Sequence, residues 1–312
     1  MTGDTPLGPG REFDLVREMM REWGDRARGI GDDAAVLASP AGGQIVLSTD
    51  TAVEGVHFRR EWLSLEEIGW RATAAALSDL AAMAAEPLGV LVALVLPPRH
   101  TEDVGALAAG IGAAASAFNA PIIGGDLTSG ESLVLAVTVV GSTAKPLART
   151  GARPGDTVWV TGQLGGPALA LAAWREGRQP MPEARARFAR PTPRIREAQW
   201  LARAGASAAI DISDGLGGDA GHLAAGSGVR ITIDAESVPL APGADVSTAQ
   251  RSGEEYELLV TTHGSFDAGV FQREFGLPLT RIGTVEKGDA GVDLMIGGER
   301  VASPEGYDHF ST

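Results

Sequence analysis

The chain has 312 residues and no cysteine, with a net charge of −14 at pH 7, 44% hydrophobic and 21% charged residues. This composition is typical of a globular protein long enough for two domains, and it excludes disulfides, thiolate metal sites and thiol nucleophiles. No basic stripe suggests nucleic-acid binding, and the longest apolar stretch, residues 90–96, is too short to span a bilayer. The first residues lack the pattern of a signal peptide, so we expect a cytoplasmic protein without membrane association.

The first half of the chain combines helical and extended patterns. Apolar residues at helical spacing predict an N-terminal amphipathic helix through Phe13, Val16, Met20 and Trp23. Ser64 and Glu67 form a capping-box pattern, which predicts an alanine-rich helix that should end near Pro87. A further helix is predicted over residues 104–118, and strands over residues 35–37, 44–49, 90–96, 121–123 and 133–140.

A segment rich in Lys, Arg, Pro and Gly, residues 142–156, is predicted to link two domains. Beyond it, strands are predicted over residues 158–160, 208–210, 229–233 and 256–260, and helices over residues 165–173, 193–203 and 214–225. The sequence therefore predicts a mixed α+β protein of two α/β domains, residues 1–145 and residues 146–312.

Acidic motifs are the most informative feature of the sequence. They are Gly31-Asp32-Asp33, Ser48-Thr49-Asp50, Ser78-Asp79, Gly124-Gly125-Asp126 and Asp211-Ile212-Ser213-Asp214-Gly215. Each one alone also fits a turn or a helix cap. Their carboxylates are ligands that Mg²⁺ prefers, and two like charges about 4 Å apart repel by roughly 4 kcal/mol at an effective dielectric near 20. If the aspartates converge, divalent ions remove that conflict and bridge to phosphate oxygens, so the set predicts a multi-metal site for a polyphosphate.

Asp79 is expected late in the alanine-rich helix, where the helix dipole disfavours an anion by about 0.3–1 kcal/mol. No Lys or Arg lies between Arg71 and Arg99, so a bound cation is the simplest partner for a buried Asp79, although an exposed Asp79 needs none. Arg149 fits either a phosphate contact or an ordinary solvated side chain, and His57 fits a packed histidine. No P-loop or protein-kinase motif is present, and no HExxH spacing suggests zinc.

Read in order, these motifs resemble the thiamine-monophosphate kinase family. The matching segments are GIGDDAAVL (29–37), STDTAVEGVHF (48–58), LSDLAAM (77–83), IIGGDLTSG (122–130), RTGARPGD (149–156), VTGQLG (160–165), AIDISDGL (209–216), SGEEYELL (252–259) and GYDHF (306–310). Single motifs are shared with a wider superfamily that includes aminoimidazole ribonucleotide synthetase and selenophosphate synthetase. The combination of EGVHF with the GYDHF tail is specific to the thiamine enzymes.

The resemblance implies an ATP- and Mg²⁺-dependent phosphorylation of thiamine phosphate to thiamine diphosphate. It also implies a homodimer whose N-terminal mixed sheets meet, and a sandwich-like C-terminal domain that completes the nucleotide and substrate site. The implied metal ligands are Asp33, Ser48, Thr49, Asp50, Asp79, Asp126, Asp211 and Asp214, among which Asp50, Asp126 and Asp214 would be catalytic. The implied ATP contacts are Gly125, Asp126, Arg149 and Ser213, and the implied thiamine phosphate contacts are His57, Glu254 and Tyr307.

The chain departs from the usual family pattern at Ala76, Ala84, Leu127 and Glu255. The acceptor oxygen of a phosphate monoester is already anionic near neutral pH, so we expect direct in-line transfer without a phospho-enzyme. Two alternatives remain at this point. The chain could be another ATP-dependent enzyme of the superfamily, or a non-catalytic protein that binds Mg²⁺ and a nucleotide.

Overall fold

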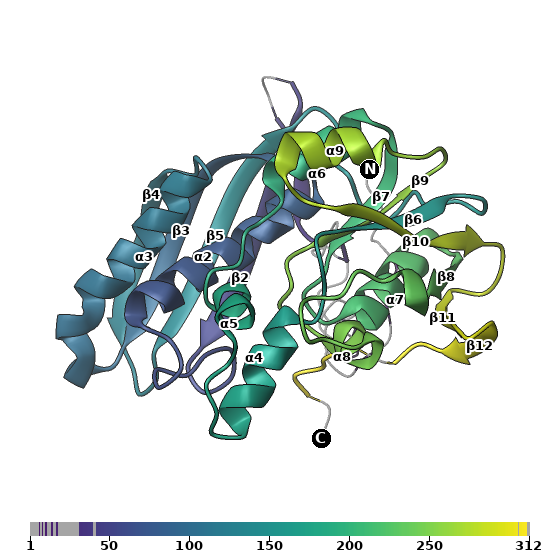
Figure 1. Ribbon diagram of the computed structural model, residues 1–312. Coiled ribbons are helices and arrows are strands. Elements are labelled where there is room, and N and C mark those ends of the chain that lie inside the picture. Colours follow the sequence, from purple (N-terminus) through teal and green to yellow (C-terminus); the bar gives the residue numbers. More distant parts are fainter. Residues whose placement is uncertain are drawn as a thin grey trace.

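The computed structural model describes residues 6, 8, 10, 14, 17, 31–39, 42–304 and 306–310. The helix predicted from Phe13, Val16, Met20 and Trp23 falls outside these residues. The described chain forms two mixed sheets, one from each half of the sequence, with helices packed against both (Figure 1). Among the described helices, none combines the length and the hydrophobicity that a membrane span requires.

The first sheet has the strand order β1-β2-β5-β3-β4. Its strands are β1 (Ala35–Ala38), β2 (Gln44–Val53), β3 (Glu86–Leu96), β4 (Ile122–Ser129) and β5 (Val134–Thr143). β3 and β4 run parallel, and the other neighbours run antiparallel. Side chains alternate between the two faces of a strand, so Leu135, Val137 and Val139 of β5 are buried on the face that α2 (Leu65–Ala82) and α3 (Val104–Ala117) cover.

Helices α2 and α3 cross at close range because glycines lie where they meet. A Cβ atom at Gly110 would lie 1.9 Å from the carbonyl oxygen of Glu66, and one at Gly69 would lie 2.4 Å from the carbonyl oxygen of Leu107. Glycine lowers the helix propensity at these two positions, but it lets the two helices pack closely.

The predicted capping box at the start of α2 is confirmed. The Ser64 hydroxyl accepts the backbone N–H of Glu67 at 3.2 Å, and the Glu67 carboxylate accepts the backbone N–H of Ser64 at 2.9 Å. Arg185 of α5 (Pro182–Ala189) also donates to both carboxylate oxygens of Glu67, at 2.6 and 2.8 Å. The cap thus fixes the first turn of α2 and its contact with a helix of the other half of the chain.

Replacing Ser64 by alanine is expected to lower the free energy of unfolding by about 1 kcal/mol, because the N-cap side chain satisfies a backbone donor at the start of α2. Chemical denaturation of the full chain measures the change. Ser64→Asp keeps an acceptor oxygen at the cap and is the control, so it should retain most of the stability. Equal losses in both variants would show that the cap bond does not stabilise the helix.

Helix α2 ends earlier than predicted, at Ala82 instead of near Pro87. Ala84 adopts a left-handed conformation with φ of 51°, and the N–H of Ala85 bonds to the carbonyl oxygen of Leu80 at 2.8 Å. This is the Schellman arrangement, in which glycine usually occupies the left-handed position. Because Ala84 stands where a glycine would indicate the end of a helix, the sequence predicted a helix that is too long.

The second sheet has the strand order β12-β11-β8-β10-β6-β9-β7, in which only β11 and β8 pair in parallel among the described strands. Its strands are β6 (Thr157–Thr161), β7 (Ala206–Asp211), β8 (Arg230–Asp234), β9 (Leu258–Thr262), β10 (Leu279–Glu286), β11 (Gly291–Ile296) and β12 (Glu299–Ala302). The other helices are α4 (Gly166–Arg175), α5, α6 (Ile195–Arg203), α7 (Leu216–Ser227), α8 (Val246–Arg251) and α9 (Ala268–Phe275), with 3₁₀ turns η2 (Pro98–Asp103) and η3 (Ala235–Ser237). The predicted fold class of two α/β domains with mixed sheets is confirmed, while the boundary between residues 145 and 146 stays a prediction.

One hydrophobic core connects the two sheets. It includes Leu80 of α2, Val139 of β5 and Val260 of β9, all buried. A second core, with Ile210, Leu223 and Ile231, lies on the other face of the second sheet beneath α7. Helix α2 therefore packs against both halves of the chain, and any side chain that it directs between the sheets can meet residues from both.

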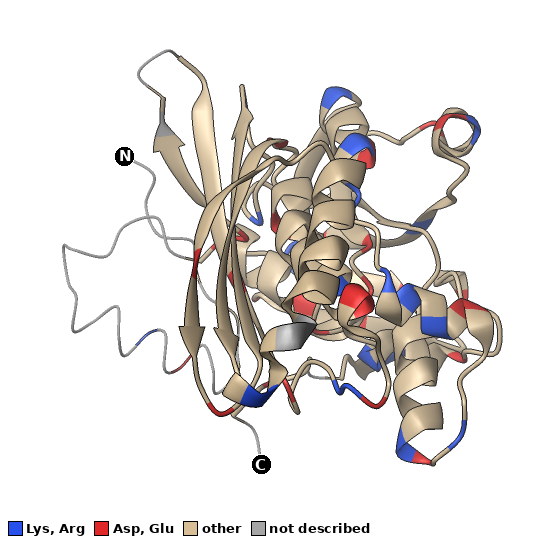
Figure 2. Ribbon diagram, turned by 90° about the vertical axis from the view of Figure 1, so that its left-hand side faces the viewer, with Lys and Arg blue, Asp and Glu red and all other residues tan. Residues whose placement is uncertain are grey.

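The outer face of the first sheet is not covered by the described helices. Figure 2 shows the sheet with helices on one side only. On its edge strand β4 every residue is exposed, including Ile122 at 50%, Ile123 at 57% and Leu127 at 61%. Leu127 is one of the departures from the family pattern, and it increases the apolar character of this edge.

Candidate active site

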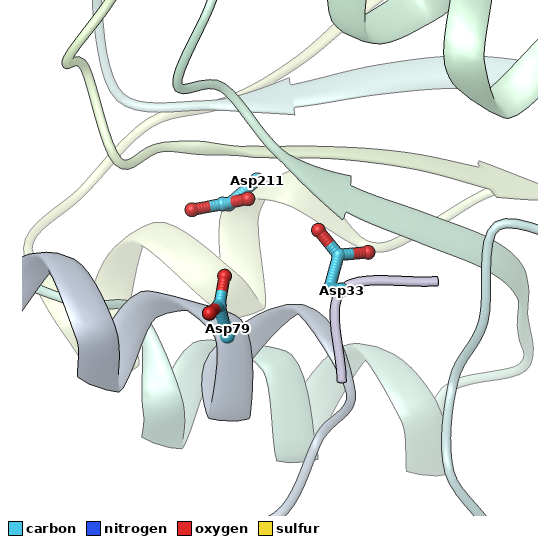
Figure 3. A group of neighbouring side chains, drawn as sticks. All are labelled: Asp33, Asp79 and Asp211. Carbon is cyan, nitrogen blue, oxygen red and sulfur yellow. The ribbon is translucent and has the colours of Figure 1, made fainter. Parts of the chain in front are cut away.

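Carboxylates of Asp33, Asp79 and Asp211 converge between the two sheets (Figure 3). One oxygen from each of them lies within 4.8 Å of the others. Asp33 precedes β1, Asp79 lies in the last turn of α2, and Asp211 ends β7. Segments far apart in the sequence thus bring three acidic groups to one point, as the sequence predicted for part of its set.

Serine hydroxyls orient two of these carboxylates. Ser48 of β2 donates to Asp79 at 2.5 Å, and Ser78 donates to Asp211 at 2.5 Å. Ser78 and Asp79 are adjacent on α2, so this helix supplies one carboxylate of the group and also the hydroxyl that donates to another carboxylate, that of Asp211. These bonds hold the acidic groups in place despite their mutual repulsion.

Burial raises the pKa of Asp79 and Asp211 in this group and of the neighbouring Asp32. Burial, then the charge of Asp33, raise the pKa of Asp211 to about 8. Burial, then the charge of Asp211, raise the pKa of Asp79 well above its ordinary value. Burial and the adjacent Asp33 raise the pKa of Asp32 to about 6. These shifts show that the protein alone stabilises the deprotonated, negatively charged form of these carboxyls poorly.

Arg149 balances part of this charge. Its guanidinium donates to both carboxylate oxygens of Asp33, at 2.9 and 3.0 Å, and its backbone N–H donates to Asp32 at 3.1 Å. The predicted ATP contact therefore borders the acidic cluster, and its charge is compatible with phosphate as well as with carboxylate. Asp32, which the sequence motif contains but which was not among the predicted site residues, fixes the backbone of Arg149.

The loop of residues 211–215 is organised by a carboxylate that the sequence reading missed. One oxygen of Asp219, on the first turn of α7, accepts the backbone N–H groups of both Ser213 and Asp214 at 3.1 Å. Asp219 is buried, and burial followed by the charge of Asp214 raise its pKa well above the ordinary value. It orders the backbone of two predicted site residues, although Asp214 does not join the group of three carboxylates.

A second cluster lies beside the first one. Asp50, His57, Arg71, Glu254 and Tyr256 line one pocket, which we call the acceptor pocket, together with the apolar side chains of Phe58, Ile68, Ala72 and Ala75. The Glu254 carboxylate accepts from the Tyr256 hydroxyl at 2.9 Å and pairs with Arg71. The sequence had predicted Asp50, His57 and Glu254 as site residues, but not Arg71 or Tyr256.

Backbone bonds tie this pocket to the acidic loop. The N–H of Glu254 donates to the carbonyl oxygen of Ser213 at 2.7 Å, and the N–H of Tyr256 donates to that of Ile212 at 2.9 Å. Glu254 and Tyr256 both have left-handed backbones, with φ of 62° and 53°. Such strain in non-glycine residues costs of order 1–3 kcal/mol each and is typical of functional sites.

Glu255, a departure from the family pattern, points away from the pocket. It is buried, accepts the backbone N–H of Gly165 at 2.5 Å and an N–H of Arg187 at 3.1 Å. The longer side chain therefore reaches partners under the loop and leaves Glu254 in place. Ala76, another departure, is fully buried in α2, where it packs in the core.

The C-terminal segment lies across the site. The N–H of Tyr307 donates to the carbonyl oxygen of Asp214 at 2.9 Å, and the ring of His309 lies 5.0 Å from that of His57 and 4.9 Å from that of Tyr307. The Tyr307 side chain is 58% exposed. Its aromatic face is thus available for stacking beside the acceptor pocket, and His309 is a further ring at the same place.

Of the predicted metal ligands, Asp50 and Asp214 lie near the group of three carboxylates without joining it, whereas Thr49 and Asp126, together with the predicted ATP contact Gly125, lie away from it. Thr49 is exposed and bonds to Thr138 at 2.8 Å, on the face of β2 opposite to Ser48 and Asp50. Gly125 and Asp126 lie within β4, whereas the sequence predicted a strand over residues 121–123 only. Asp126 pairs with Ala93 of β3, which places its side chain on the outer face of the sheet. Three strand spacings, about 14 Å in all, separate β4 from β2. A Cβ at Gly125 would lie 2.0 Å from the carbonyl oxygen of Val92, so strand pairing itself requires this glycine.

Mg²⁺ fits the group of three carboxylates. The donors are carboxylate oxygens, Asp33 and Asp211 are buried, and the raised pKa values of Asp79 and Asp211 show that the protein lacks enough positive charge to balance them. A hard divalent cation with oxygen ligands meets that demand. Ser48 and Asp50 lie on the same face of β2, which faces the group.

Mg²⁺ is expected to stabilise the protein more at pH 8 than at pH 5.5. The carboxyls with raised pKa values favour folding while protonated, at low pH, and this contribution is lost as the pH rises through about 6 for Asp32 and about 8 for Asp211. The cation binds the deprotonated groups, so its effect grows over the same window. Thermal unfolding in EDTA and in Mg²⁺ at several pH values measures the difference. In Asp211→Asn the pH dependence should be weaker, and an equal Mg²⁺ effect at all pH values in the parent chain would contradict the assignment.

Comparison with known proteins agrees with this geometry. The chain matches the AIR synthase related protein N-terminal domain over residues 31–143 and the corresponding C-terminal domain over residues 153–294. The fold and the carboxylate site thus define an AIR synthase related protein. A thiamine-monophosphate kinase from Salmonella typhimurium is 36% identical, with 97% of each chain covered. The chain belongs to the thiamine-monophosphate kinase family.

Solved structures give the same result. The structure of AaThiL complexed with AMPPCP and TMP superimposes with a TM-score of 0.84 at 31% identity, covering 96% of this chain and 97% of the other. The thiamine-monophosphate kinase from Stenotrophomonas maltophilia has a TM-score of 0.77 at 37% identity, covering 95% and 98%. The similarity therefore extends over both sheets, including the segments that form the site.

Proposed function

We propose that this chain transfers the γ-phosphate of ATP to the phosphate of thiamine phosphate in one in-line step, giving thiamine diphosphate and ADP. The observation that carries the proposal is the convergence of Asp33, Asp79 and Asp211 within 4.8 Å beside the acceptor pocket, in a member of this family. The relative solved with AMPPCP, an ATP analogue, and TMP supports the same pair of substrates.

The residues of the chain then have distinct tasks. Asp33, Asp79 and Asp211 would hold Mg²⁺, with Ser48 and Asp50 next to them. When bound, the ions neutralise phosphate charge, which is the main requirement of phosphoryl transfer. Arg149 and Ser213 border this group and are our candidates for contacts with ATP.

No general base is needed in this proposal. The attacking oxygen belongs to a phosphate monoester and is anionic near neutral pH, so the protein has to align it and exclude water. Burial, then the neighbouring His309, lower the pKa of His57, and its Nδ1 accepts the backbone N–H of Val53 at 3.1 Å. The neutral ring therefore carries its proton on Nε2 and serves as a hydrogen-bond donor.

A second copy of the chain is part of the proposal. The outer face of the first sheet carries Thr49 and Asp126, which the group of three carboxylates does not include, and Gly125 precedes Asp126 on the edge strand β4. Its edge exposes Ile122, Ile123 and Leu127. A homodimer that covers this face would bury them, and the mass of the protein in solution by light scattering tests this. We place the enzyme in the cytoplasm.

A coupled ADP-release assay tests the function. ADP is expected only when ATP, Mg²⁺ and thiamine phosphate are all present, and thiamine diphosphate is expected as the product. Release with free thiamine alone would overturn the choice of acceptor. Release with a substrate of another superfamily member would favour a different ATP-dependent enzyme, and binding of ATP without any release would favour a non-catalytic protein.

A further inference from the structure

Arg71 is a residue of the acceptor pocket that the site described above leaves without a role. Its side chain is 5% exposed, and it lies on α2 between the two sheets. One nitrogen donates to the carbonyl oxygen of Phe188, and the guanidinium lies 3.8 Å from the centre of the Phe188 ring. These contacts fix the plane of the guanidinium, while its other nitrogen pairs with Glu254 in the pocket.

The charge of the pocket makes Arg71 distinctive. Among the described residues that line it, Arg71 carries the one full positive charge, since the pKa of His57 is lowered by burial and by His309. Asp50 and Glu254 contribute negative charge to the same pocket. A phosphate group that enters here meets carboxylates unless a cation accompanies or faces it, and a planar guanidinium binds phosphate with paired hydrogen bonds.

The position of Arg71 on the helix suits a phosphate next to the metal group. Arg71, Ala75 and Asp79 follow one another at intervals of four residues, so they lie on one face of α2. At about 1.5 Å of rise per residue, Arg71 and Asp79 are about 12 Å apart along the axis. The small side chain of Ala75 lies between them and also lines the pocket. A phosphate between the two ends can therefore face the metal group on one side and Arg71 on the other.

The Arg71–Glu254 pair also matches the charges of the proposed acceptor. Thiamine phosphate carries a cationic ring at one end and an anionic phosphate at the other. A guanidinium and a carboxylate side by side present the complementary charges, and the exposed ring of Tyr307 lies near the same opening. When thiamine phosphate binds, Arg71 can exchange Glu254 for the phosphate, and Glu254 can exchange Arg71 for the cationic ring.

We propose that Arg71 binds the acceptor phosphate and thereby makes the enzyme select a phosphate ester over the free alcohol. This inference rests on the proposed function. It makes Arg71 a specificity-determining residue, in addition to the carboxylates that hold the metal.

The test compares Arg71→Gln and Arg71→Lys with the parent protein. In the Gln variant the KM for thiamine phosphate is expected to rise about 10- to 100-fold, because a hydrogen bond to a charged group contributes that much to binding. The KM for ATP should change by less than about 3-fold. The Lys variant keeps the charge without the planar donors and should show a smaller rise. Calorimetry on the full chain should show that thiamine phosphate loses its advantage in Kd over thiamine.

Arg185→Gln is the matched control, because Arg185 also pairs with a residue of α2 but does not line the acceptor pocket. Its KM values should equal those of the parent. An unchanged KM for thiamine phosphate in the Arg71 variants, or an equal loss of affinity for thiamine and thiamine phosphate, would overturn the inference. If Arg71→Gln does not fold, the Lys variant alone decides in the same way. Failure of the parent protein to turn over thiamine phosphate would instead refute the proposed function.

Discussion

Replacing Asp79 by asparagine is expected to lower kcat/KM for thiamine phosphate by roughly a hundredfold or more and to make the metal-free protein more stable. The amide keeps the shape of the side chain and can still accept from Ser48, but it removes one negative charge from the group of three. Without that charge Mg²⁺ binds more weakly, and the repulsion from Asp33 and Asp211 falls.

Steady-state kinetics at several Mg²⁺ concentrations and denaturation in EDTA measure the two effects. The expected gain in free energy of unfolding at pH 8 is about 1–4 kcal/mol, below the full repulsion of two charges at about 4 Å. Asp289→Asn makes the same change on an exposed turn and should alter neither quantity. An Asp79→Asn variant with normal activity at low Mg²⁺ would show that this carboxylate does not hold the metal.

Replacing Glu257 by alanine is expected to destabilise the protein by about 3–5 kcal/mol, the largest stability effect that we predict. Glu257 is fully buried and accepts two bonds from Arg194, at 2.6 and 2.8 Å, one from Arg187 at 3.2 Å and one from Thr161 at 2.7 Å. Without the carboxylate, Arg194 keeps only Glu197, at 3.8 Å, and Arg187 keeps only Glu255, so the charges of both arginines are less well compensated.

Denaturant unfolding of the two-domain chain, followed by tryptophan fluorescence, tests this expectation. Glu176→Ala removes an exposed partner of Arg178 and should cost less than about 1 kcal/mol, because solvent screens that pair. A similar small loss at Glu257 would mean that water or a rearranged side chain takes its place.

Much of the fold follows from local patterns. The capping box of Ser64 and Glu67, the strand that ends at Asp211 and the position of Asp79 late in a helix were all predicted, because each depends on residues close in the sequence. The convergence of aspartates was predicted from the set of acidic motifs, although each motif alone also fitted a turn or a cap, and the structure shows it for Asp33, Asp79 and Asp211.

Other features depend on contacts that no local pattern contains. The strand predicted over residues 121–123 stopped before Gly124, but β4 continues through Gly124 and Gly125 because Gly125 pairs closely with Val92. Helix α5 was not predicted, since its eight residues mix charges with alanines and its stability comes from packing. Arg71 was missed because its partners Phe188 and Glu254 lie on other segments, although the spacing from Arg71 to Asp79 could have pointed to a common helix face. Asp219 was missed although its partners Ser213 and Asp214 are close in the sequence, because an aspartate in the first turn of a helix is also common without such bonds.

Helix α2 has a consequence for how the enzyme opens. It belongs to the core shared by both sheets and carries Arg71, Ser78 and Asp79, so the two halves cannot swing apart without unpacking it. Access for ATP and for the acceptor then falls to the surface segments around the site, above all residues 306–310.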